Sequence, residues 1–530
     1  MARVMSKATP AGGVQEAIQQ IQERIKSGEL DQAARLARNA CTDHPGSVNV
    51  YLLASQVEQR LGHFDDMLSR AEQASAIDSG NLGARFRMLE CLLYCGRVDR
   101  VLDDLAELEN KADSDHHMLC KVAEYYTHCA DHEAALRCYR RARELDPENP
   151  EYLFALASSE IANGDLDEGE RLLDQAIELN PHDYDAYRNR ATLKKQSADN
   201  NHIKEILSVL NSGVRRPAGE AQLCYALAKE YEDLNEDMHA FRWLQRGASK
   251  RRSLLSYGVE GDLEVMGRLQ SVFNQALMDR GVGGFAEEGP IFVIGLPRSG
   301  TTLVDRILSS HSKVSSLGEI NNFAYSLMHT IGTAGNKLQL VDLSANIDFA
   351  DLGERYVESM RSYRNRSPYL IDKTPLNYLY VGLIHLALPN ARIIHIRRNP
   401  MDSCYGMYRT LFRAGYPFSY DFDDLARYYI AYVQLMEHWR TVAPKALSDV
   451  SYEDLVDEQE KTSREIIDYC GLDWEPVCLD FHKNTSAVAT ASSAQVRRPV
   501  YRDALQRWRR YENELQPLIE RLREAGIAVD

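Results

Sequence analysis

The chain has 530 residues, of which 44% are hydrophobic and 26% charged, so it is long enough for two or more globular domains. Its net charge of −16 is unevenly distributed: residues 1–280 hold 34 Lys and Arg against 46 Asp and Glu, whereas residues 281–530 hold 28 against 32. The acidic first half argues against a general affinity for nucleic acid, so no nucleic-acid partner is expected.

Cysteine usage indicates a reducing compartment, and the hydropathy pattern argues against a membrane span. The ten cysteines are scattered, with no CxxC pair and no histidine at zinc-ligand spacing, which favours free thiols and no metal site. The opening stretch MARVMSKATPAGG lacks the apolar segment of a signal peptide, and no apolar run approaches the roughly 20 residues that cross a bilayer. We expect a cytoplasmic protein without a membrane span.

Small and turn-forming residues recur every 34 positions through the first half of the chain. The first series is Gly28, Gly62, Gly96, Ala130 and Gly164; the second is Ala40, Ala74, Leu108, Ala142 and Ala176; the third is Pro45, Ser79, Asp113, Pro147 and Pro181. The spacing is that of tetratricopeptide repeats, in which each unit is a pair of antiparallel helices. Small residues let paired helices and neighbouring units approach closely, and proline follows the second helix, where no backbone donor is needed. About six or seven units are expected, ending near residue 250.

A stack of such units offers a concave surface that commonly binds extended peptides. We therefore expect the repeats to bind a protein or peptide. Self-association into a homodimer and packing support for the rest of the chain are the alternatives.

A change of pattern marks a second domain. The segment DRGVGGFAEEGP contains four glycines and ends in proline, which is typical of a linker. Behind it, short runs rich in β-branched residues alternate with helical stretches, and this alternation predicts a parallel α/β sheet with ligands at the carboxyl ends of its strands. Strands are expected at 291–295, 369–372 and 392–396, and helices at 301–310 and 377–388. We assign residues 1–265 to the helical repeats, 266–289 to the linker and 290–530 to the α/β domain.

The sequence GLPRSGTT follows the first expected strand and begins at Gly295. A strand, a glycine-rich turn and a helix amino terminus form a cradle for an anion, because backbone N–H groups converge there and the helix dipole adds positive charge. An ATPase loop has lysine after its second glycine; this loop has threonine there, and an arginine inside the loop supplies the charge. The loop therefore predicts a smaller phosphate group, bound without an obligatory metal. Its candidate anion-binding residues are Arg298, Ser299, Gly300, Thr301 and Thr302.

The loop resembles the 5′-phosphosulfate loop of the sulfotransferases, whose donor is 3′-phosphoadenylyl sulfate (PAPS). A second motif of that family begins with an arginine at a strand end, followed by Asn-Pro or a similar pair. Here HIRRNPMDSCYGMY places Arg398 at the 3′-phosphate position. The resemblance covers about residues 288–512. It implies a multidomain chain, with an all-α tetratricopeptide-repeat solenoid followed by an α/β P-loop-type parallel-sheet sulfotransferase domain, an arrangement found in bacterial sulfotransferases.

This region is more similar to the tyrosylprotein sulfotransferases than to the small-phenol enzymes. In SSLGEINNF, Glu319 lies 21 residues beyond Arg298 and matches the catalytic base of the tyrosylprotein branch. IDKTPLN places Lys373 near the transferred group, so Arg298 and Lys373 are expected to stabilise charge on the sulfuryl and leaving oxygens. VSYEDLV places Tyr452 at a donor-binding tyrosine. The late segment ASSAQVRRPVYRDALQRW resembles the family's loop over the nucleotide at Ser492, Gln495, Pro499, Arg507 and Trp508.

Two features depart from the family. Gly406 stands where a serine usually follows Arg398 by eight residues, so the resemblance implies that one hydrogen bond to the 3′-phosphate is lost, or is replaced by one from the backbone or from Arg409. The sequence also shows no membrane anchor of the kind found in the animal tyrosylprotein enzymes. His311 would be the first substitute if Glu319 were not the base.

The resemblance implies transfer of a sulfuryl group from PAPS to a hydroxyl acceptor. Our first hypothesis for the acceptor is tyrosine in a protein or peptide delivered by the repeats. The second is a small molecule, lipid or glycan, with the repeats used for assembly, and the third is a non-catalytic repeat adaptor. The arginine-rich late segment is expected to cover the nucleotide rather than to bind nucleic acid.

Overall fold

The structure, a computed structural model, describes residues 11–280, 283–490, 493–503 and 505–529. They form two compact units. Residues 11–104, 283–285 and 321–365 belong to the first unit, and residues 105–280, 286–320 and 366–529 to the second. Among these described residues, no helix is both long enough and apolar enough to pass through a bilayer.

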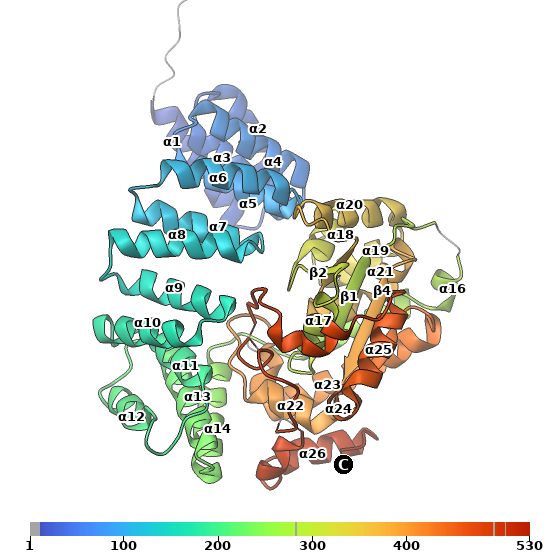
Figure 1. Cartoon of the computed structure of the whole chain (residues 1–530). Helices are drawn as coiled ribbons and strands as arrows, with labels where there is room; N and C mark the ends of the chain where they lie inside the picture. Colours follow the sequence, from blue (N-terminus) through green and yellow to red (C-terminus); the bar gives the residue numbers. More distant parts are fainter. Residues whose placement is uncertain (1–10, 281–282, 491–492, 504, 530) are drawn as a thin grey trace, which may run out of the picture. The chain divides into compact units, whose positions relative to one another are not determined.

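Paired helices joined by short turns build the first half of the chain (Figure 1). They are α1 (Ala11–Lys26), α2 (Leu30–Asp43), α3 (Val48–Leu61), α4 (Phe64–Ile77), α5 (Leu82–Tyr94), α6 (Val98–Lys111), α7 (His116–His128), α8 (His132–Leu145), α9 (Pro150–Asn163) and α10 (Leu166–Leu179). The glycine series falls in the turns within the pairs: Gly62 follows α3 and Gly164 follows α9, both in the left-handed conformation. The alanine series lies in the second helix of each pair, where Ala74 and Ala142 are completely buried. The tetratricopeptide-like solenoid predicted from the 34-residue period is confirmed.

The repeat pattern becomes irregular toward its end. The helices here are α11 (Tyr184–Leu193), α12 (Ile203–Asn211), α13 (Pro217–Asp233) and α14 (Asp237–Ser253). An isolated bridge between Ser197 and Asn200 interrupts the helices near the position where the sequence period slips. Two further helices, α15 (Glu260–Val272) and α16 (Gln275–Met278), overlap the segment expected to be a linker. The domain boundaries at 265 and 290 stay a prediction.

In the first unit, the early repeats pack against an insertion from the second half of the chain. The insertion consists of α18 (Asn322–Ile331), α19 (Lys337–Ser344) and α20 (Phe349–Arg361). Ser362 Oγ donates a hydrogen bond of 2.8 Å to the carbonyl oxygen of Gly96, and a Cβ atom on that glycine would lie 2.5 Å from Ser359 Cβ. The turn after α5 therefore requires glycine, because a larger residue would separate the repeats from the insertion.

The second unit contains a five-stranded parallel sheet in the order β2-β3-β1-β4-β5. The strands are β1 (Pro290–Gly295), β2 (Val314–Ser316), β3 (Tyr369–Asp372), β4 (Arg392–Arg397) and β5 (Ser448–Ser451). In the centre of the sheet, Ile291 pairs with Ile371 of β3 and Arg392 of β4. The three predicted strands and the α/β class are confirmed, while β2 and β5 are short strands that the sequence pattern did not indicate.

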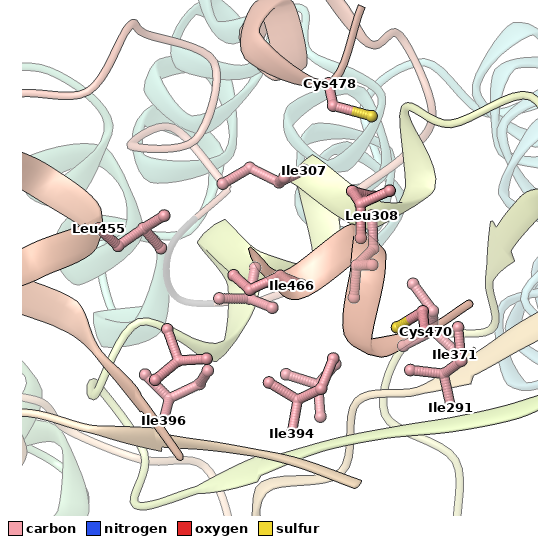
Figure 2. Close-up of a cluster of buried hydrophobic side chains, with 14 of the residues drawn as sticks. Ile291, Ile307, Leu308, Ile371, Ile394, Ile396, Leu455, Ile466, Cys470 and Cys478 are labelled. Carbon is pink, nitrogen blue, oxygen red and sulfur yellow. The ribbon is translucent and has the colours of Figure 1, made fainter. Parts of the chain in front are cut away.

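The helices of this region pack on the sheet or on one another, and together they bury the apolar side chains of the strands. They are α17 (Thr301–Ser309), α21 (Val381–Ala387), α22 (Pro400–Tyr408), α23 (Phe422–Val442), α24 (Tyr452–Asp457), α25 (Gln459–Tyr469) and α26 (Gln516–Glu524), with 3-10 turns η1 (Pro375–Tyr380), η2 (Pro417–Tyr420), η3 (Pro476–Lys483) and η4 (Arg507–Tyr511). Figure 2 shows the core, in which Ile394 and Ile396 of β4 contribute to one cluster with Ile307 of α17 and Ile466 of α25. Such a core holds the strands rigidly, so that the loops at their carboxyl ends keep a defined geometry.

Candidate active site

The loop between β1 and α17 has a backbone that only glycine tolerates at its second glycine position. Gly300 has φ of 109°, and a Cβ atom there would lie 2.4 Å from Cδ2 of Tyr452. Arg298 also has a positive φ, of 70°, which is uncommon for a residue with a side chain. The Ser299 hydroxyl is buried and has no hydrogen-bond partner among the described residues, although a buried hydroxyl normally has one. The loop thus keeps an unused polar group beside the amino terminus of α17, as expected for an anion cradle.

Arg398, at the end of β4, faces this loop. Its Nη1 donates a hydrogen bond of 2.8 Å to the carbonyl oxygen of Arg298, and its guanidinium carbon lies 4.5 Å from the ring centroid of Tyr452. The next residue, Asn399, caps α22 by accepting bonds from two backbone N–H groups. The capped helix and the stacked ring together fix the position of the Arg398 side chain at the end of the strand. The structure therefore brings the two predicted anion motifs to one place.

Positive charge accumulates around Arg298. Burial and the nearby charges of Arg409 and Arg398 lower the pKa of Arg298 to about 10. Gly406, on α22, lies against the same side chain, since a Cβ atom there would be 3.3 Å from Arg298 Cβ. A cluster of like charges of this kind is stabilised when an anion binds between its members.

Glu319 and Lys373 form an ion pair at the neighbouring strand ends. The chain beyond β2 continues beside β3, because Lys373 N donates a 2.9 Å bond to the carbonyl oxygen of Gly318 and Leu317 N donates a 2.9 Å bond to that of Ile371. Lys373 is almost completely buried, whereas the Glu319 side chain keeps 47% of its surface exposed. The carboxylate is therefore open to an incoming molecule while the ammonium group is held inside.

A buried carboxyl group near this pair was not foreseen from the sequence. Asp305, on α17, is 5% exposed; burial raises its pKa, and the charge of Lys373 opposes that effect. Tyr416 also lies near Glu319, and burial together with the Glu319 charge raises its pKa well above the usual range. No periodicity or motif marks either residue, because each reaches the site only through the packing of α17 and of the loop before η2.

The late segment meets the loop through a residue that the resemblance singled out. Arg298 Nη2 donates a 2.9 Å bond to Oε1 of Gln495. Pro499 is exposed, and Trp508 is buried. Ser492 lies outside the described residues. Each of these assignments remains a prediction.

Arg507 is placed beside a helix of the repeats. Its Nη1 lies 3.6 Å from Oε2 of Glu232 on α13, and the same carboxylate pairs with Arg409. The sequence did not point to Glu232, because no motif links this helix of the repeats to the site.

His311, the alternative base, is buried and bonded through Nε2 to the carbonyl oxygen of Asp473 at 2.8 Å, which gives it a packing role.

Comparisons with known proteins give matches in both halves of the chain. Residues 290–476 match the model of the family described as "Sulfotransferase family", and residues 130–184 and 154–193 match "Tetratricopeptide repeat" models. The chain carries a sulfotransferase-family domain behind tetratricopeptide repeats.

Relatives match either most of the chain or less than half of it. An uncharacterized protein of Aquifex aeolicus (strain VF5) is 30% identical over 455 residues, covering 83% of this chain and 59% of that protein. Protein-tyrosine sulfotransferase A of Caenorhabditis elegans is 26% identical over 250 residues, covering 44% of this chain and 65% of its own length. The chain thus spans about three fifths of the length of these relatives. Among solved structures, the sulfotransferase domain from the olefin synthase of Synechococcus PCC 7002 aligns at 20% identity with a TM-score of 0.32, covering 43% of this chain and 90% of that one.

Proposed function

Since the chain carries a sulfotransferase-family domain joined to tetratricopeptide repeats, we propose that it transfers a sulfuryl group from PAPS to a hydroxyl acceptor, and that this acceptor is tyrosine in a protein or peptide delivered by the repeats. The observation that carries the proposal is the placement of the Glu319–Lys373 pair and the Arg298–Arg398 cluster at the carboxyl ends of adjoining strands of one sheet.

The anion site that the chain builds supports PAPS as the donor. The buried, unpartnered hydroxyl of Ser299 and the N–H groups at the start of α17 would bind the 5′-phosphosulfate, together with the backbone of Gly300, Thr301 and Thr302. Arg398 would bind the 3′-phosphate, and Tyr452 would present its ring to the adenine. PAPS supplies the activated sulfuryl group, and no residue needs to bind a metal in this scheme.

Glu319 is proposed as the base. A tyrosine hydroxyl has a pKa near 10, so ionising it beforehand at pH 7 would cost about 4 kcal/mol. A carboxylate that takes the proton during attack avoids this step and contributes roughly 10²- to 10⁴-fold in rate. The exposed Glu319 carboxylate can meet an acceptor from solvent, and the buried ammonium group of Lys373 beside it can stabilise negative charge on the oxygen that leaves. Arg298 would stabilise the sulfuryl oxygens in the same way.

The test uses the full chain with PAPS carrying radioactive sulfur and a lysate of the source cell. Label in protein, recovered as sulfated tyrosine after hydrolysis, supports the proposal. Label in lipid or sugar alone would show that the acceptor is not tyrosine, but it would still support sulfuryl transfer. Binding of adenosine 3′,5′-bisphosphate (PAP) with no labelled product in any fraction would identify a non-catalytic adaptor. The role of Glu319 is tested by comparing the transfer of label by Glu319→Gln with that by the wild-type chain. Glu465→Gln, a change of an exposed residue on α25, is the matched control.

A further inference from the structure

A carboxylate of the repeats contacts residues far along the chain within the second unit. Glu232 lies at the end of α13, with 6% of its side chain exposed. Its carboxylate pairs with the guanidinium group of Arg409 and accepts a 3.0 Å bond from the Tyr405 hydroxyl, residues that follow it by 177 and 173 positions. Nη1 of Arg507 lies 3.6 Å from the same carboxylate. One repeat side chain therefore holds two arginines of the sulfotransferase region.

The contacts keep this carboxylate charged. Burial raises the pKa of Glu232, but the charges of Arg409 and Arg507 outweigh burial, so the pKa lies below its usual value. A buried ionised carboxylate is tolerated only when cationic and hydrogen-bonding partners surround it. Its partners are correspondingly restricted, since moving either guanidinium group away would remove part of the positive charge that compensates the carboxylate.

Arg409 lies near the donor loop, and Arg507 is connected to the helix that follows Arg398. The charge of Arg409 is close enough to lower the pKa of Arg298. Arg507 is tied to α22 through its neighbour, because Gln506 N donates a 2.8 Å bond to Oδ2 of Asp402. The side chains of Arg409 and Arg507 keep 26% and 30% of their surface exposed, so neither is sealed in by its partner.

The same helix, α22, carries the departure from the family pattern at Gly406, where no hydroxyl is available for the 3′-phosphate. Arg409 is the residue after α22, less than one turn beyond Gly406. A guanidinium group held in place can supply charge-assisted hydrogen bonds to a phosphate, and a restrained side chain loses less conformational entropy on binding than a free one.

We propose that Glu232 is a positioning residue of the donor site. It directs Arg409 and Arg507 toward the 3′-phosphate of the donor, so that their guanidinium groups replace the hydroxyl that is missing at Gly406. The inference rests on the proposed function. It makes a helix of the repeats part of the donor site, in addition to any role in binding an acceptor. The proposed contacts are to the 3′-phosphate on the donor's ribose, so the effect is confined to ligands that carry this phosphate.

The test measures, by calorimetry on the full chain, the affinities for PAP and for adenosine 5′-monophosphate (AMP), which differ by the 3′-phosphate. Glu232→Gln keeps the shape of the side chain and removes its charge. The matched control is Glu230→Gln, on the same helix; Glu230 is also buried but bonds to His202 inside the repeats, through Oε2 to the backbone N–H at 2.7 Å and through Oε1 to Nδ1 at 2.9 Å.

We expect Glu232→Gln to weaken PAP binding on the order of tenfold or more and to leave AMP binding unchanged, so that the preference for PAP falls. Glu230→Gln should keep the wild-type preference. Tighter binding of both nucleotides by Glu232→Gln, or an unchanged PAP-to-AMP ratio, would overturn the inference. If Glu232→Gln fails to fold, Arg409→Lys is the second test. This variant leaves Glu232 intact and keeps the positive charge but loses the planar donor group, and it should reduce the same PAP-to-AMP ratio. A wild-type chain with no preference for PAP would instead refute the proposed function.

Discussion

Replacing Gly300 by alanine tests the geometry on which the donor site depends. The residue has φ of 109°, and the new Cβ atom would lie 2.4 Å from Cδ2 and 2.9 Å from Cε2 of Tyr452. A side chain in the left-handed region costs about 1–2 kcal/mol, and overpacking against a buried ring costs about 1–3 kcal/mol more. We expect Gly300→Ala to lower the free energy of unfolding by about 2–5 kcal/mol.

Urea denaturation measures this loss, and Gly526→Ala is the matched control. Gly526 has φ of 77° and no atom within 4 Å of the added Cβ, so its replacement should cost only the backbone part, about 1–2 kcal/mol. Displacing Tyr452 would also break its stacking with Arg398, worth about 0.5–2 kcal/mol, so PAP affinity should fall roughly 2- to 30-fold in Gly300→Ala alone. Equal stability losses in the two variants, or unchanged PAP affinity in Gly300→Ala, would refute the close contact between loop and ring.

Three further changes address the base, the sheet edge and the segment around Ser486. Glu319→Gln should reduce turnover roughly 10²- to 10⁴-fold at unchanged PAP affinity, as followed by transfer of labelled sulfur; retained turnover would move the base elsewhere. Burial raises the pKa of Asp449, but the hydrogen bonds led by Arg440 outweigh it and hold the pKa well below its usual range, so the stabilisation is complete above the unfolded pKa of about 3.9 and is lost as pH falls below it. Asp449→Asn should therefore flatten the acid limb of urea midpoints measured from pH 6 downward, and an unaltered limb would contradict the assignment. Arg306→Ala removes the 3.0 Å bond from Nη1 to the carbonyl oxygen of Ser486, so amide exchange in that segment should accelerate, whereas exchange at the wild-type rate would show that other contacts hold it.

The repeats were predictable because each helix pair is specified by residues close to one another in sequence. A glycine or alanine every 34 positions marks a turn or a helix–helix contact, and the structure places Gly62 and Ala142 accordingly. The central strands were predictable for a similar reason: β1 and β4 are short runs rich in β-branched residues, and their central residues are buried. The strand Val314–Ser316 has three residues, two of them serine, which is too short and too polar to give a periodic signal.

The candidate site divides in the same way. The loop around Arg298 and Gly300 is a local motif, so its strand–turn–helix geometry was foreseen, while the roles given to its residues stay predictions. The burial of Lys373 and the exposure of Glu319 were not foreseen, because they depend on how the chain beyond β2 lies along β3.

The sequence by itself determined the helix pairs, the central strands and the loop that follows β1, since each arises from interactions among residues near one another along the chain. The tertiary structure alone decided that Gln495 meets Arg298, that Asp305 lies buried near Lys373, and that the Glu232 carboxylate lies against two arginines more than 170 positions away. Contacts at such separations follow from how complete elements pack, because shape and burial must be satisfied over whole surfaces, and no local pattern of residues records that outcome.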